Sequence, residues 1–144
     1  MTPYRAPGWL PGGQAQTLWP LLIKAPPLPL RRERWDTPDG DFIDVDHLDA
    51  PAGAPLLVLF HGLEGSARSH YAISTAHACK RQGWRLAIPH FRGCSGELNR
   101  RPRAYHSGDS DEIDWILRRL QQANVGQRLH AAGISLGGNA LLKW

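Results

Sequence analysis

Apolar residues in this chain fall into short continuous runs separated by stretches with helical spacing. The run 56–60 is entirely apolar, which is typical of a strand buried on both faces of a sheet. The mainly apolar segments 84–88 and 129–134 predict two further strands, of which the second is also expected to be buried. Between the first two strands, residues 69–82 predict a helix, and Gly83 stands where a left-handed C-terminal cap is usual.

A second helix is predicted between the last two strands. Its apolar face repeats at i, i+3, i+4 and i+7, through Ile113, Ile116, Leu117 and Leu120. Asp109 and Glu112 have the spacing of a capping box, and Arg118-Arg119 suit the negative C-terminal end of the helix dipole. Strand, helix, strand, helix, strand at these lengths predicts a parallel sheet built by right-handed crossovers.

An antiparallel hairpin is predicted before this unit. Residues 31–35 and 42–48 flank Asp39-Gly40, a dipeptide that supports a tight turn. The second segment alternates as a half-buried strand does, with Phe42, Asp44 and Asp46 against Ile43, Val45 and His47.

Proline divides the chain into two regions, because ten of the 12 prolines precede residue 56. Residues 1–30 are predicted to form an irregular, extended N-terminal arm, since their prolines interrupt helical hydrogen bonding. Apolar side chains of the arm, such as Trp9, Trp19 and Leu22, need a surface to cover. Packing against the rest of the fold is expected, and a lipid or substrate lid is the alternative. Residues 31–144 are predicted to form the folded domain.

Composition narrows the class of protein. A length of 144 residues leaves room for one domain, and 42% hydrophobic with 21% charged residues is usual for soluble globular chains. The formal net charge of +4 is too small to indicate a nucleic-acid partner. Cys79 and Cys94 fit neither a metal motif nor a disulfide framework, and no apolar stretch is long enough to span a membrane. A cytoplasmic protein is therefore expected.

The candidate chemistry lies where the last predicted strand ends. That strand runs into Gly133-Ile134-Ser135-Leu136-Gly137, and the residues that follow begin a helix. A G-x-S-x-G sequence between a strand and a helix is typical of a nucleophile elbow. A serine hydroxyl is a weak nucleophile that must project from a sharp turn toward a base, and the flanking glycines relieve the crowding at that turn. Ser135 is the predicted nucleophile.

Two backbone N–H groups are predicted to bind the oxyanion. One belongs to Leu136, the residue after the nucleophile, and the other should come from the loop after the first buried strand. Within that loop, residues 61–66, the N–H of Leu63 is the best candidate. Glu64 is interpreted as a loop-stabilising residue, because the catalytic acid follows the serine in hydrolases with this elbow. No nucleotide or phosphate-loop motif is present, so neither a cofactor nor a metal is expected.

Several segments together resemble the YheT-like branch of the α/β-hydrolase superfamily. The specific part is the stretch from Phe91-Arg92-Gly93-Cys94-Ser95-Gly96-Glu97 to Tyr105-His106-Ser107-Gly108. The elbow and the 61–66 loop add to it, and the likeness extends to residues 16–20, 31–34 and 38–41. Gln14 stands where the family commonly has histidine, so the arm is given no catalytic role.

The resemblance implies the N-terminal portion of an α/β-hydrolase fold in residues 31–144, truncated after the elbow. It also implies a serine carboxylesterase or acylglycerol lipase acting on a small-molecule or lipid ester through an acyl-enzyme. The triad of such enzymes runs Ser, Asp or Glu, then His, and residues 136–144 contain none of these acids or histidines. The isolated chain is therefore expected to be inactive. An acyltransferase or thioesterase of the same fold, and a non-catalytic remnant that only binds, remain as alternatives.

The other reactive side chains are interpreted as structural. This group contains the upstream histidines His61, His90, His106 and His130, and the packed thiol of Cys94. A basic cluster of Arg92, Arg100, Arg101 and Arg103 is expected to be solvated loop charge, with contact to an acidic lipid head group or a partner as the alternative. Without a downstream neighbour, strand 129–134 would expose an apolar edge, so self-association of the isolated chain is expected.

Overall fold

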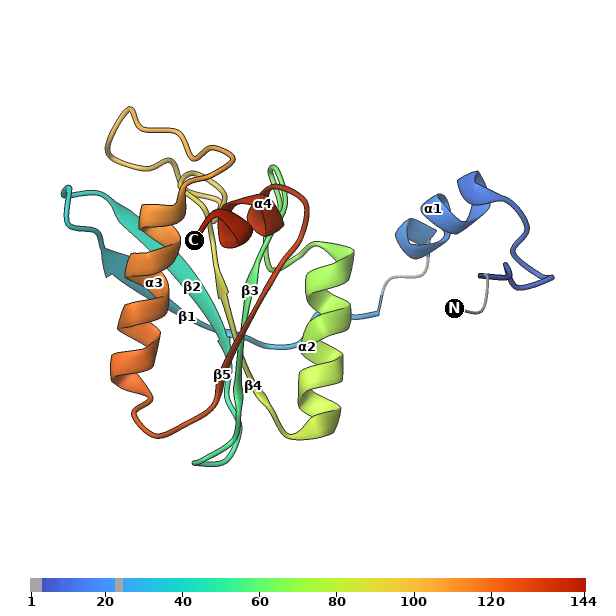
Figure 1. Ribbon diagram of the computed structural model, residues 1–144, viewed down its shortest axis with the longest axis horizontal. Helices are drawn as coiled ribbons and strands as arrows, with labels where there is room; N and C mark the ends of the chain where they lie inside the picture. The colour runs from blue at the N-terminus through green and yellow to red at the C-terminus, as the bar shows by residue number, and fades with distance from the viewer. Residues whose placement is uncertain (1–3, 23–24) are drawn as a thin grey trace.

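The computed structural model of this protein describes residues 4–22 and 25–144. Figure 1 shows a twisted sheet with helices packed against it and the N-terminal helix set apart. The strands are β1 (Arg31–Asp36), β2 (Phe42–Leu48), β3 (Leu56–Phe60), β4 (Arg85–Pro89) and β5 (Leu129–Gly133). The helices are α1 (Gly13–Leu22), α2 (His70–Gln82), α3 (Ser110–Ala123) and α4 (Leu136–Lys143).

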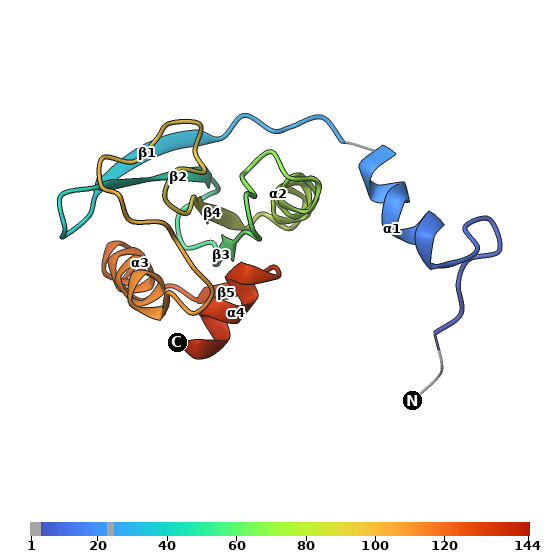
Figure 2. The same cartoon turned by 90° about the horizontal axis from the view of Figure 1, so that it is seen from above.

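The described strands form one mixed sheet in the order β1-β2-β4-β3-β5. β3 pairs in parallel with β4 on one side and with β5 on the other, whereas β1 with β2 and β2 with β4 are antiparallel. Because β4 and β5 flank β3 on opposite sides, two crossovers of the same hand place α2 and α3 on opposite faces, as Figure 2 shows. The predicted hairpin followed by a parallel β-α-β-α-β unit is therefore confirmed.

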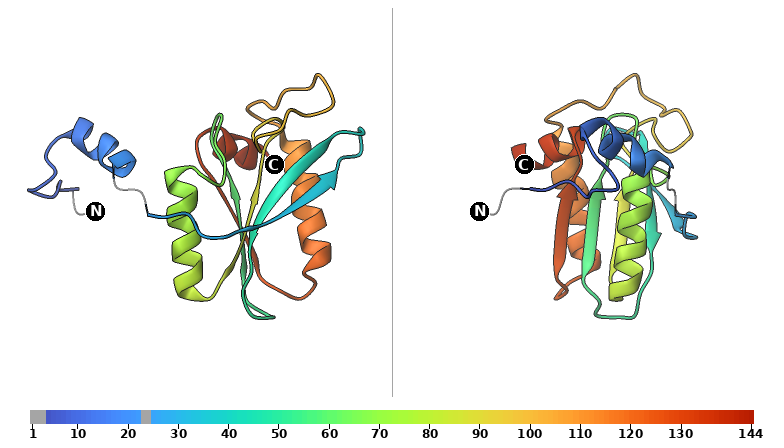
Figure 3. Two further views of the ribbon diagram at one scale, coloured as in Figure 1. Left: turned by 180° about the vertical axis from the view of Figure 1, so that it is seen from behind. Right: turned by 90° about the vertical axis from the view of Figure 1, so that its right-hand side faces the viewer.

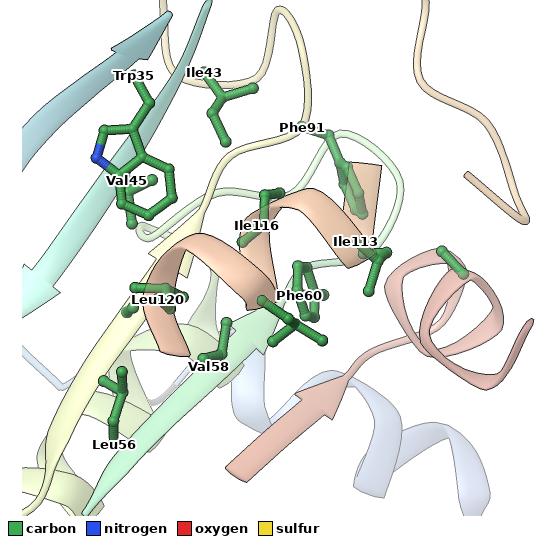
Figure 4. Packing of buried hydrophobic residues seen from close by; sticks show 13 residues of the cluster. Trp35, Ile43, Val45, Leu56, Val58, Phe60, Phe91, Ile113, Ile116 and Leu120 are labelled. Carbon is green, nitrogen blue, oxygen red and sulfur yellow. The ribbon is translucent and has the colours of Figure 1, made fainter. Parts of the chain in front are cut away.

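Side chains of β3 divide between two cores. Leu56, Val58 and Phe60 point toward α3, where they pack with Ile113 and other residues of its apolar face (Figure 4). Leu57 and Leu59 pack on the opposite face with α2. The two helices enclose the sheet between them (Figure 3). This double coverage explains why an uninterrupted apolar run forms the central strand.

The N-terminal arm differs from its prediction, although residues 1–3, 23 and 24 lie outside the described part. Residues 13–22 form the ten-residue helix α1, because the other prolines of the arm lie outside this segment and Pro20 falls only near its C-terminal end. Trp9 and Leu22 are 65% and 76% exposed, so the expected packing against the fold is wrong for these side chains, whereas Leu28 and Leu30 at the end of the arm pack on the core beside α2. The Trp9 and Trp19 rings instead pack on each other, with centroids 5.2 Å apart.

The ends of α3 also differ from their prediction. The side chain of Asp109 makes no capping hydrogen bond. It accepts one from Arg103 at 2.6 Å, while Glu112 accepts one from Arg92 at 2.8 Å. The capping box is wrong because two arginines of the loop before α3 bind both carboxylates. The helix also continues to Ala123, so its last turn contains no basic residue and Arg118-Arg119 lie before it.

Two strands are buried differently from their predictions. β2 is buried on both faces, because Asp44 and Asp46 are bound by arginines of β1, at 2.8 Å from Arg34 and 2.7 Å from Arg32. β5 is only partly buried, since its one partner among the described strands is β3. The α4 helix after β5 carries Leu142 with 91% of its surface exposed. β5 therefore forms an accessible edge of the described sheet, next to an exposed leucine of α4.

Candidate active site

Ser135 occupies the turn between β5 and α4 in an unusual backbone conformation. Its φ is 52° and its ψ is −114°, a region that residues other than glycine rarely adopt. The hydroxyl makes no capping hydrogen bond to α4. The predicted strand-to-helix elbow is thus present, with strain concentrated on the serine and its side chain left free for other contacts.

Glycines allow this turn to pack directly on the end of β3. A Cβ atom added to Gly137 would lie 2.5 Å from the carbonyl oxygen of His61 and 2.6 Å from that of Phe60. A Cβ atom added to Gly133 would lie 2.6 Å from the backbone of Gly137. Backbone atoms cannot move aside as a flexible side chain can, so the elbow requires glycine at both positions.

Gly137→Ala is expected to lower the free energy of unfolding by about 2–3 kcal/mol, because the added methyl group overpacks the contact with β3. Gly13→Ala is the matched control, since nothing lies within 4 Å of a Cβ atom there, and it should change stability by less than about 0.5 kcal/mol. Urea unfolding of both variants measures the difference. Equal stability of Gly137→Ala and wild type would contradict the close approach of the elbow to β3.

The loop after β3 lies beside the elbow. A Cβ atom added to Gly62 would be 3.4 Å from the Cβ atom of Ser135. Ser135 and the loop residues Leu63 and Glu64 line one open cavity of about 460 Å³. The structure therefore places Leu63, Leu136 and Ser135 at the same end of the sheet, where the sequence predicted an oxyanion site.

Two residues that the sequence reasoning did not single out also line this cavity. His70 and Tyr71 form the first turn of α2, which begins close to the loop. Their position depends on how α2 packs against β3 and β4, and no local pattern in the sequence indicates it. Tyr105, which the sequence indicated only as part of the family-specific stretch, contacts the same loop: its hydroxyl accepts a hydrogen bond from the Glu64 N–H at 2.7 Å.

His61 is held as a neutral structural residue. Its Nε2 accepts a hydrogen bond from the Phe91 N–H at 3.0 Å, so its Nδ1 carries the proton and donates to the Gly62 carbonyl at 2.7 Å. Burial lowers the pKa of His61 to about 4. With both ring nitrogens occupied, His61 has no free nitrogen to accept the Ser135 proton, which confirms its predicted structural role.

The other three predicted structural histidines lie away from the cavity. His90 is buried and its Nε2 is 2.8 Å from a carboxylate oxygen of Asp46. His106 is exposed, and its Nδ1 is 3.0 Å from the carbonyl oxygen of Ser107. His130 is exposed and stacks on Trp84, in contrast to its predicted place on a buried strand.

Buried ion pairs hold Arg92, so the interpretation of the basic cluster as solvated loop charge is wrong for this residue, whereas Arg100, Arg101 and Arg103 are exposed. Arg92 is buried, with nitrogen atoms 2.8 Å from Asp39, 3.1 Å from Asp41 and 2.8 Å from Glu112. Arg103 pairs with Asp109 at 2.6 Å. The surrounding acids come from the β1–β2 turn and from α3. The cluster therefore ties the 91–109 loop to two other elements, which an inspection of local charge in the sequence does not reveal.

Arg100 and Arg101 extend the same attachment. Arg100 pairs with Asp36 at 2.9 Å, and the Nε of Arg101 donates to the Asp39 carbonyl at 3.0 Å.

Cys94, within the same loop, is partly buried, and burial raises the pKa of its thiol. This agrees with the predicted packed thiol.

Metal and membrane features are absent from the part of the chain that the structure describes. Among residues 4–22 and 25–144, no group of three or more histidine, cysteine or carboxylate side chains is arranged to hold a metal ion. Within the same ranges, no helix has the length and apolar character needed to cross a bilayer.

The fold and the elbow define an α/β-hydrolase, and comparison with known proteins agrees. Residues 55–144 match the alpha/beta hydrolase fold family, to which this chain belongs. "Putative esterase YheT" of Escherichia coli (strain K12) is 48% identical over 112 residues, which cover 76% of this chain and 33% of that protein. The resemblance to the YheT-like branch is thereby confirmed.

More distant relatives extend the comparison. "Phospholipase ABHD3" of Mus musculus is 28% identical over 145 residues, covering 94% of this chain and 35% of that protein. A serine hydrolase without a lid from Xanthomonas campestris has a TM-score of 0.64 at 20% identity, over 82% of this chain and 57% of its own, and shows the shared fold. The chain thus spans about a third of the length of these curated relatives.

Proposed function

We propose that this protein is a serine-dependent carboxylic ester hydrolase in which Ser135 forms an acyl-enzyme. The observation that carries the proposal is the strained elbow, which presents a hydroxyl without a capping partner to a cavity shared with the 61–65 loop. A serine with only a structural role would require neither the positive φ nor glycines at two positions where a side chain would collide with backbone atoms. The family membership and the names of the relatives, an esterase and a phospholipase, support ester hydrolysis.

The proposed reaction begins with attack of the Ser135 oxygen on the ester carbonyl carbon. The carbonyl oxygen becomes an oxyanion that the N–H groups of Leu63 and Leu136 stabilise. Collapse of this intermediate releases the alcohol and leaves an acyl group on Ser135, which water then hydrolyses to the free acid. A base must accept the serine proton, and in this fold the histidine and its acid follow the serine along the chain.

The cavity favours an acyl ester with a polar portion. Leu63, Ile134 and the ring of Tyr71 provide an apolar surface beside Ser135, and Arg68 and His70 provide polar groups at the same cavity. A short-chain carboxylic ester or an acylglycerol combines both characters. We propose this substrate class, with peripheral contact to a lipid surface where the ester belongs to a lipid.

Product analysis tests the function class. The complete gene product is incubated with p-nitrophenyl butyrate in water and, in parallel, with added glycerol. We expect butyric acid as the main product in both mixtures, because water is the proposed acyl acceptor. Absence of turnover with short-chain and acylglycerol esters would contradict the proposal, and butyrylglycerol as the only product would assign an acyltransferase instead.

The isolated chain is expected to hydrolyse the same ester at less than about one thousandth of the rate of the complete gene product, because a serine without its base loses most of its catalytic power. Spectrophotometric release of p-nitrophenol from both proteins provides the comparison. Rapid hydrolysis by the isolated chain that disappears in Ser135→Ala would show that a base within residues 1–144 serves the nucleophile. His70, which lines the cavity, would then be the first residue to test.

A further inference from the structure

The backbone donors of the loop beside Ser135 are almost all occupied. The Gly62 N–H donates to the Tyr71 hydroxyl at 3.0 Å, and the Glu64 N–H donates to the Tyr105 hydroxyl at 2.7 Å. The Gly65 N–H donates to the Gly62 carbonyl at 3.0 Å. Of the four N–H groups of residues 62–65, only that of Leu63 has no hydrogen-bond acceptor within residues 4–22 and 25–144. Residues 62–65 therefore present a single free donor, and its residue, Leu63, lines the Ser135 cavity.

Aromatic packing holds the ring of Tyr105 in place beside this loop. Its ring stacks on Phe91, with centroids 5.1 Å apart and planes 5° from parallel. Phe91 is buried and packs edge-on against the ring of His61, 4.8 Å away. Tyr105 belongs to the 91–109 loop, the gold segment that arches over the end of the sheet near α4 in Figure 1. The ring is thus held independently of the hydrogen bond that its hydroxyl accepts.

Asp41 binds the part of that loop that precedes Tyr105. Its buried carboxylate accepts hydrogen bonds from the Arg100 N–H at 2.8 Å and from the Asn99 side chain at 3.0 Å. The Asn99 amide also donates to the carbonyls of Arg101 and Arg103. The segment of this loop that directly precedes Tyr105 is therefore fixed, although it has no regular secondary structure.

The Tyr71 hydroxyl approaches the loop from α2. Tyr71 is the second residue of that helix, so its backbone position is set by the packing of α2 on the sheet. A Cβ atom on Gly65 would collide with this hydroxyl, which shows how closely the tyrosine and the loop approach each other. Tyr71 and Tyr105 thus hold the N–H groups on either side of Leu63.

Glu64 shows that this arrangement is not the relaxed state of the loop. Its φ is 51°, in the left-handed region that costs a residue with a side chain about 1–3 kcal/mol unless the surroundings enforce it. The hydrogen bond from its own N–H to Tyr105 is such an enforcing contact. The strained residue directly follows Leu63. The hydrogen bond to Tyr105 therefore lies one residue from the N–H group that is proposed to bind the oxyanion.

We infer that the hydroxyls of Tyr71 and Tyr105 are positioning groups that aim the Leu63 N–H at the oxyanion formed on the Ser135 adduct. This inference rests on the proposed function. Neither tyrosine touches the reacting carbonyl in this role, because each acts through a backbone N–H next to Leu63. Their hydroxyls consequently affect the bound transition state more than the bound substrate.

The test variant is Tyr105→Phe in the complete gene product, which removes the hydroxyl and keeps the ring on Phe91. Loss of an oxyanion donor lowers kcat by about 10²–10³, so a misaimed donor is expected to lower it about tenfold with KM within about twofold. Affinity for a trifluoromethyl propyl ketone, whose serine adduct carries an oxyanion, should fall by about the same tenfold factor. Tyr4→Phe is the matched control, because that hydroxyl bonds to Gln16 in the arm, and it should leave all three values unchanged.

A second readout does not depend on activity. Amide hydrogen exchange at the Glu64 N–H should become at least about tenfold faster in Tyr105→Phe, while exchange in β3 stays unchanged. If Tyr105→Phe does not fold, Tyr71→Phe applies the same test through the Gly62 N–H. Unchanged Glu64 exchange, unchanged ketone affinity in a folded variant, or parallel changes in KM and ketone affinity would each overturn the inference. Full activity of Ser135→Ala would instead overturn the proposed function, and the exchange data would still decide whether Tyr105 holds the loop.

Discussion

Ser135→Ala in the complete gene product is expected to lower kcat for p-nitrophenyl butyrate by at least about 10⁴, because removal of the nucleophile leaves only the binding site and the oxyanion donors. KM should change little, since the hydroxyl contributes to bond formation more than to substrate binding. Stability should stay close to that of the wild type, because alanine at the same positive φ bears the same strain as serine. Steady-state kinetics with thermal unfolding of the same preparation measures both effects.

The matched control for this variant is Ser74→Ala. Ser74 is exposed on α2, so its replacement should leave kcat and melting temperature unchanged. A Ser135→Ala enzyme that retains activity within tenfold of the wild type would remove Ser135 from the mechanism. A loss of activity that only follows a loss of folded protein would show that the elbow matters for stability alone.

Asp41→Ala is expected to destabilise the protein by about 3–5 kcal/mol, because it removes a fully buried partner from an ionic network. The Asp41 carboxylate accepts hydrogen bonds from two side chains and three backbone N–H groups: those of Arg92 and Asn99, and those of Phe42, Arg100 and Arg101. Asp49→Ala is the control, since Asp49 forms an exposed pair with Arg31. Its removal should cost less than about 1 kcal/mol. Urea unfolding of the two variants near neutral pH makes the comparison.

The pH dependence of Asp41→Ala gives an independent check. Burial alone would raise the pKa of Asp41, but hydrogen bonds from the Arg100 N–H, Asn99 and the other donors lower it to about 2. A carboxyl whose folded pKa lies below its unfolded value of about 4 contributes stability above pH 4 and loses it as the pH falls toward 2. The stability difference between wild type and Asp41→Ala should therefore shrink from pH 4 to pH 2. A difference that stays constant over this range would show that the carboxylate is not held in its charged form.

Features set by local sequence were predictable. The apolar run 56–60 became the central strand β3, and Gly83 adopts the left-handed conformation that ends α2, with a φ of 67°. The strand, turn and helix around Ser135 were likewise indicated by residues adjacent in the chain. In each case the physical cause lies within a few residues: periodicity, a missing Cβ atom, or a sharp turn.

Features set by long-range contacts were not predictable in this way. The capping box of α3 fails because Arg92 binds Glu112 across 20 residues of chain, and the bend of the 91–109 loop brings Arg103 onto Asp109. Asp44 is buried because Arg34 lies across from it in the neighbouring strand. Tyr71 and Tyr105 reach the loop beside Ser135 only after α2 and the 91–109 loop have packed. The sequence of each segment does not indicate which residue it contacts in the fold, so local patterns cannot predict these contacts.

Covalent labelling of the complete gene product with a fluorophosphonate tests the central claim most directly, because this reagent reacts with an activated serine and mimics the tetrahedral intermediate. Intact-mass measurement followed by peptide mapping locates the adduct. We expect one adduct per chain, on Ser135, with loss of esterase activity in proportion to labelling. An adduct on another residue, or full esterase activity in protein that remains unlabelled at Ser135, would contradict the claim that Ser135 is the nucleophile.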